Sequence, residues 1–81
     1  MGSLKKRSVN LAGHATSLAL EEEFWRVLDE AALDEAISMA ALIQRIDTER
    51  GDRPLASACR VFALLRTADH PGRGETGAGA G

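Results

Sequence analysis

The chain has 81 residues and a formal net charge of −2, which allows one small domain. A single domain of this size buries only about 60% of the surface of its unfolded chain, so disulfides, a metal or a second chain commonly add stability. The one cysteine, Cys59, excludes an intrachain disulfide, and its spacing from His14 and His70 does not fit a zinc site. We therefore expect a homo-oligomer without a metal or a cofactor.

Several classes of protein are excluded by missing sequence signals. No stretch approaches the roughly 18 apolar residues of a membrane span, and polar residues interrupt the apolar stretch that follows the basic N-terminus, which argues against a signal peptide. There is no glycine-rich phosphate loop and no nucleophile elbow, so we predict no enzymatic activity and no catalytic residues. The single thiol favours a reducing, cytoplasmic setting.

The charges are distributed unevenly along the chain. The net charge is +3 over residues 1–20, −7 over residues 21–52 and +2 over residues 53–81. A nucleic-acid-binding protein is usually more basic overall. Binding to DNA would therefore require a local basic patch, with the acidic elements turned away from the phosphates.

The N-terminal part is expected to be extended. We assign residues 1–5 to a flexible N-terminus and residues 6–20 to a strand region, which opens a domain over 6–69. Residues 16–20 alternate with the period of a β-strand. One face of this strand holds Thr16, Leu18 and Leu20. The opposite face holds small residues, namely Ala15, Ser17 and Ala19.

The preceding segment leaves two interpretations open. Residues 7–11 also alternate, and Gly13 could form a turn, so residues 6–20 could fold into a β-hairpin. Alternatively, a loose basic arm carrying Lys5, Lys6 and Arg7 precedes a single strand.

Three helices are predicted, over about 22–35, 39–50 and 55–68. The first has an apolar stripe that includes Phe24 and Leu28, with Trp25 at its flank as a partly buried packing residue. Ser38 is a suitable N-cap for the second helix, and Gly51 a suitable stop. The last segment, residues 70–81, is rich in glycine and is expected to be disordered.

A single strand must find a partner for its backbone groups. The simplest partner is the same strand of a second chain, which would form a two-fold antiparallel ribbon above the helices. The apolar positions then predict a dimer core of Thr16, Leu18, Leu20, Phe24, Leu28, Leu42, Ile43 and Ile46.

Two sequence stretches resemble those of short bacterial ribbon-helix-helix proteins. They read Lys-Arg-Ser-Val at residues 6–9 and Gly-His-Ala-Thr-Ser-Leu-Ala-Leu-Glu-Glu-Glu-Phe-Trp at residues 13–25. Further matches lie at residues 41–43, 46–47, 50–51 and 55–62. The resemblance covers about residues 5–65. It implies a mainly α fold with a short N-terminal β-ribbon in an intertwined homodimer, to which the residue pattern adds a third C-terminal helix.

The resemblance also implies DNA as the partner and a small transcriptional regulator or antitoxin-like autoregulator as the function. The ribbon of such proteins enters the major groove, where the outward residues Ala15, Ser17 and Ala19 would face the bases. The start of the second helix, at Ser38 and Met39, would bind a phosphate. We assign further phosphate contacts to Lys5, Lys6 and Arg7.

Departures from the family pattern motivate an alternative function. Many relatives have Arg or Lys at the position of Ala15 and a polar residue at that of Ala19, whereas alanine can contact only a thymine methyl group. A dimer of hairpins would also have a four-stranded sheet, roughly 14 Å between its outer strands against a groove about 12 Å wide. The alternative is a dimeric protein-interaction module that has lost base readout, with the acidic first helix open to a basic protein partner.

Overall fold

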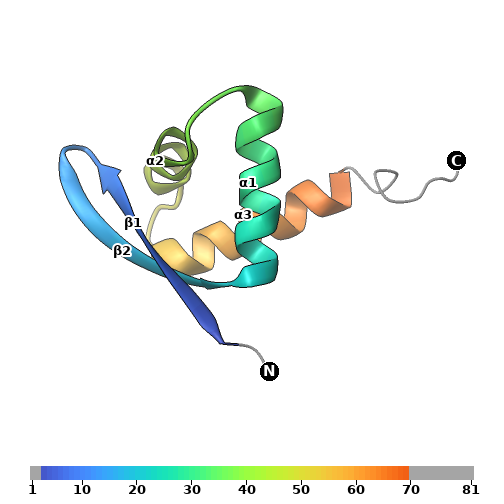
Figure 1. The fold of residues 1–81 in the computed structure, drawn as a ribbon, viewed down its shortest axis with the longest axis horizontal. Coiled ribbons are helices and arrows are strands. Elements are labelled where there is room, and N and C mark those ends of the chain that lie inside the picture. The colour runs from blue at the N-terminus through green and yellow to red at the C-terminus, as the bar shows by residue number, and fades with distance from the viewer. Residues whose placement is uncertain (1–2, 70–81) are drawn as a thin grey trace, which may run out of the picture.

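The computed structural model describes residues 3–69, which form two strands followed by three helices (Figure 1). The predicted mainly α fold with an N-terminal β-ribbon and a third C-terminal helix is confirmed. The disorder predicted for residues 70–81 lies outside the described residues. In chain order the elements are β1 (Leu4–Leu11), β2 (His14–Glu21), α1 (Glu22–Glu35), α2 (Met39–Glu49) and α3 (Leu55–Asp69).

The two strands form an antiparallel β-hairpin within one chain. Its register runs from Leu4 opposite Glu21 to Leu11 opposite His14. Only Ala12 and Gly13 connect the strands, and both have positive φ, +50° and +84°, as a type I′ turn requires. The hairpin interpretation is therefore correct and the loose arm is not present. Strand β1 begins two residues before the start of the domain that we expected from the sequence.

One face of the hairpin packs on the helices. Side chains alternate along both strands, so Val9 and Leu11 of β1 lie on the same face as Leu18 and Leu20 of β2, and all four are buried. They join a core that extends through all three helices. Its largest fully buried side chains are Trp25, Leu20, Leu28, Leu42, Ile43 and Cys59.

The prediction that Trp25 is only partly buried, at the flank of the apolar stripe, is wrong. Its side chain is only 1% exposed, whereas Phe24 is partly buried. The indole Nε1 donates a hydrogen bond of 2.8 Å to the backbone carbonyl of Lys5. The apolar stripe of α1 is therefore centred nearer Trp25 than expected, and this side chain joins α1 to β1.

Helix α1 ends in a left-handed residue that is not glycine. Ala36 has φ +56° and ψ +42°, and its N–H donates to the carbonyl of Leu33 at 3.1 Å. The N–H of Ile37 donates to the carbonyl of Ala32 at 3.0 Å, which completes a Schellman motif. The Cβ of an L-residue costs about 1–2 kcal/mol in this conformation, so Ala36 is a strained position.

We expect Ala36→Gly to raise the free energy of unfolding by about 0.5–1 kcal/mol, because the removed strain outweighs the added freedom of the unfolded chain. Urea denaturation would measure the change. Ala41→Gly is the matched control, because Ala41 is an exposed residue of right-handed helix, where glycine costs about 1 kcal/mol. Loss of stability in both variants would contradict the left-handed end of α1.

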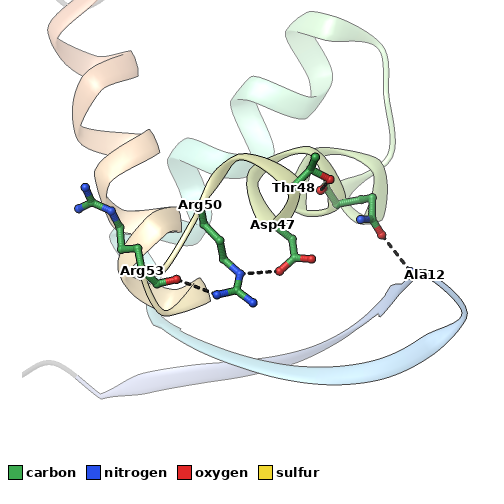
Figure 2. A network of polar contacts seen from close by, with 6 residues as sticks. Ala12, Asp47, Thr48, Arg50 and Arg53 are labelled. Atoms are coloured by element: carbon green, nitrogen blue, oxygen red, sulfur yellow. Dashed lines mark hydrogen bonds and ion pairs between the residues drawn. The ribbon is translucent and has the colours of Figure 1, made fainter.

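Helix α2 begins and ends as predicted. Ser38 is confirmed as its N-cap, because its Oγ accepts a hydrogen bond of 3.0 Å from the N–H of Ala41. Gly51, with φ +62°, follows the end of the helix. In the turn to α3, Arg50 donates to the Asp47 carboxylate at 2.7 Å and to the carbonyl of Arg53 at 2.8 Å (Figure 2).

Helix α2 also fixes the tip of the hairpin. The backbone N–H of Ala12, in the turn between the strands, donates a hydrogen bond of 2.9 Å to Oε1 of Gln44 (Figure 2). The turn is thus held on the helical layer through one side chain.

Candidate nucleic-acid interface

The surface of the hairpin that points away from the helices is the candidate interface, and we call it the outer face. The register pairs Lys6 with Ala19, Ser8 with Ser17 and Asn10 with Ala15 on this face. Ala19 is half-buried and the other five are exposed. A fourth pair, Leu4 with Glu21, lies on the same side at the end next to α1. The outer face is defined as the six residues between this pair and the turn, namely Lys6, Ser8, Asn10, Ala15, Ser17 and Ala19.

The three predicted base-facing residues, Ala15, Ser17 and Ala19, lie together on this face, and their contact with bases stays a prediction. Strand β1 supplies the other half of the face, of which the sequence indicated only Lys6, as a phosphate contact, and not Ser8 or Asn10. The missing signal was the hairpin register itself. Once Ala12 and Gly13 are the turn, each outward residue of β2 has a defined neighbour on β1.

The width of the hairpin suits a DNA groove. Neighbouring strands lie about 4.8 Å apart, and the major groove is about 12 Å wide and admits a two-stranded ribbon. Here one chain supplies both strands, so a single copy presents a ribbon of this width. The width argument against DNA entry applies to two hairpins paired edge to edge, and it does not apply to one hairpin.

The three basic residues at the start of the chain do not share a face. Lys6 lies on the outer face, whereas alternation along β1 places Lys5 and Arg7 on the opposite one. The Arg7 guanidinium donates to both carboxylate oxygens of Asp29 at 3.1 Å, and it lies 4.4 Å from the centre of the Trp25 ring. Hydrogen bonding to Asp29 raises the pKa of Arg7. Arg7 is therefore committed to contacts within the fold, and Lys6 is the cation of the outer face.

The start of α2 is the other predicted phosphate site. Ser38 caps the helix and Met39 packs in part against the core. Gln44, which holds the hairpin turn, is six residues beyond Ser38, or about 9 Å along a helix. A phosphate contact at Ser38 and Met39 stays a prediction.

The predicted dimer core lies mostly in the interior of one chain. Six of its eight residues are buried in the described structure, and Thr16 and Phe24 are half-buried. Burial by the same chain's β1 accounts for part of this, because β1 covers apolar residues that the sequence analysis assigned to the partner. Contact of these residues with a second chain stays a prediction.

Two carboxylates, one at each end of α1, are paired with arginines of the other two helices. Arg60 Nε donates to Oε1 of Glu21 at 3.0 Å, and this hydrogen bond lowers the pKa of Glu21. Arg45 likewise lowers the pKa of Glu35 through hydrogen bonds of 2.7 and 3.0 Å. Because both pKa values are lowered by folding, these pairs stabilise the fold above about pH 4.5, and their contribution is lost as the pH falls below that value. Glu21, the last residue of β2, is thus neutralised by α3.

Metal binding, thiol chemistry and membrane insertion are not supported by residues 3–69. No group of three histidine, cysteine or acidic residues there could hold a metal ion. The Cys59 thiol is buried, and desolvation raises its pKa to about 11, so it is not a nucleophile at neutral pH. No helix in this part of the chain is long and apolar enough to cross a membrane.

The order of the elements is a β-ribbon followed by helices α1 and α2. The family of ribbon-helix-helix domains matches residues 4–67 of the chain. The chain belongs to this family. A solved structure, that of an uncharacterized protein from Bordetella pertussis Tohama I, is 36% identical with a TM-score of 0.72. The match covers 88% of this ribbon-helix-helix chain and 62% of that chain. No curated protein matches.

Proposed function

We propose that this ribbon-helix-helix protein binds duplex DNA with the outer face of its hairpin, as a small transcriptional regulator or antitoxin-like autoregulator. Proteins of this family typically dimerise and bind DNA. The observation that carries the proposal is an exposed two-stranded ribbon of groove width. Its outer face has one lysine and three uncharged polar residues, and the carboxylate at its end, Glu21, is bound to Arg60.

The local charges also favour DNA, although the chain as a whole is acidic. Two carboxylates that contact or belong to the ribbon are paired, since Asp29 is bound to Arg7 and Glu21 is bound to Arg60. Pairing of these carboxylates reduces the repulsion that a phosphate would meet at the hairpin. Two copies in a dimer would present two such ribbons, as DNA with two half-sites requires.

The test is a titration of labelled duplexes at a series of salt concentrations. We expect the logarithm of affinity to fall linearly with the logarithm of salt concentration, and Lys6→Ala to reduce the slope by about one. Arg45→Ala removes the same charge from α2, where Arg45 is bound to Glu35, and serves as the control with an unchanged slope. Absence of binding at low salt would contradict the proposal and favour the alternative, a protein-interaction module.

A further inference from the structure

We infer that β1, and not β2, supplies the side chains that distinguish bases, with Asn10 selecting adenine and Lys6 selecting guanine. The inference rests on the proposed DNA binding and adds to it the residues and the base types. It reverses the assignment that the sequence suggested, in which the outward residues of β2 face the bases.

The register makes the two halves of the outer face unequal. In two of its three cross-strand pairs a long polar side chain of β1 lies beside an alanine of β2: Asn10 beside Ala15, and Lys6 beside Ala19. Opposite residues of antiparallel strands have their Cβ atoms about 4.5–5.5 Å apart, so the size of each neighbour decides how freely a side chain projects. Because an alanine side chain is shorter than either, Asn10 and Lys6 would reach a groove floor before their β2 neighbours do.

The two strands also differ in the hydrogen-bonding groups that their side chains present on the outer face. Ala15 and Ala19 have no side-chain donor or acceptor and can contact only a thymine methyl group. An asparagine can form two hydrogen bonds to N6 and N7 of adenine, and a lysine can donate to O6 and N7 of guanine. The central pair, Ser8 and Ser17, can donate or accept but distinguishes bases weakly.

The spacing of Asn10 and Lys6 along β1 predicts how far apart the two recognised bases lie in the preferred DNA site. Asn10 and Lys6 are four residues apart on one strand, or about 13 Å at 3.3–3.4 Å per residue. Base pairs are stacked about 3.4 Å apart, so this separation corresponds to about four steps along the duplex. The preferred site therefore contains an adenine and a guanine about four steps apart.

The fold holds β1 in place from both ends. At the turn, the N–H of Ala12 is bound to Gln44 at 2.9 Å, two residues from Asn10. At the other end, the carbonyl of Lys5 accepts from Trp25 at 2.8 Å, and the Arg7 side chain is bound to Asp29. Lys6 lies between Lys5 and Arg7, so both of its neighbours in β1 are bound to α1. A reader on an anchored strand loses less conformational entropy on binding than one on a free arm.

The experiment selects binding sites from a random duplex library and then measures affinities for the selected site and its single-base variants. For Asn10→Ala we expect the preference for adenine to fall by about 5- to 150-fold, with an unchanged salt slope. Asn10→Gln should retain the preference, because glutamine forms the same pair of hydrogen bonds. Ser17→Ala is the comparison on β2, and it should change the base preference less than Asn10→Ala does. Asn10 and Ser17 are both exposed, so unfolding curves equal to that of the unmodified protein will show that the variants are folded.

The outcomes separate this inference from the proposed function. Salt-dependent binding without any base preference overturns the inference and leaves DNA binding standing. A preference that Ser17→Ala removes and Asn10→Ala does not also overturns it, since β2 would then be the reader. Absence of binding at low salt overturns both proposals.

Discussion

Replacing Trp25 with alanine is expected to lower the free energy of unfolding by about 3–5 kcal/mol, the largest effect of any single truncation in this chain. Trp25 is 1% exposed and is the bulkiest fully buried side chain. Its ring packs in the core, carries the Arg7 guanidinium on its face and donates to the carbonyl of Lys5. Stabilities of about 0.05–0.15 kcal/mol per residue leave a chain of this length about 4–12 kcal/mol in total. The variant should therefore unfold at much lower urea concentration, as measured by circular dichroism.

Two comparison variants separate the contributions of Trp25. Trp25→Phe keeps an aromatic ring but removes the donor to the carbonyl of Lys5, which should cost about 1–3 kcal/mol. Arg26→Ala changes the neighbouring exposed residue, which has a 3.7 Å ion pair with Glu22, and should change stability by less than about 1 kcal/mol. Equal effects of Trp25→Ala and Arg26→Ala would show that Trp25 is not part of the core.

The order of the elements was predictable because it depends on local signals. Ser38 caps the start of α2 and Gly51 follows the end of the same helix. Ser38 acts through its own side chain and Gly51 through its own backbone. The faces of β2 followed from alternation alone, and Leu18 and Leu20 are buried as the pattern requires. Neither feature needs knowledge of a distant partner.

The features that the sequence did not indicate are contacts between residues far apart in the chain. Arg7 belongs to a basic run with predicted phosphate contacts, which stay a prediction, and its partner in the fold, Asp29, is 22 residues away on α1. Trp25 is adjacent to Phe24 on the helix, and Trp25 is the more deeply buried of the two, with its indole N–H bound to β1. Local periodicity contains no information on such pairings, because they depend on how the hairpin lies against α1.

The candidate site was half predictable for the same reason. The outward residues of β2 followed from alternation within one strand, but the contribution of β1 required the choice between a hairpin and an arm. That choice decides whether Asn10 and Ser8 belong to the interface at all. The sequence left it open because a turn of Ala12 and Gly13 has one residue, Gly13, that favours positive φ and one, Ala12, that does not.

A substitution in β1 tests that choice directly, and it is the second large expected effect. Val9 is 6% exposed and lies on the hairpin face that packs on the helices. Val9→Asp removes a buried apolar side chain and places a carboxylate in its position, so we expect a loss of stability on the order of 3 kcal/mol or more. Urea denaturation would measure the loss, and amide hydrogen exchange would show whether protection is lost along both strands.

Ser8→Asp is the matched control, because it introduces the same carboxylate one residue away on the exposed outer face. We expect it to change stability by less than about 0.5 kcal/mol, as other exposed substitutions do. The two variants have the same charge and nearly the same position in the sequence, so only the alternation of a paired strand can separate them. A free basic arm would tolerate both equally, and equal stabilities would therefore contradict the hairpin and, with it, the placement of Asn10 and Lys6 on one reading face. A large difference requires β1 to be packed on the helices in the register described, because a shift of one residue would exchange the two results.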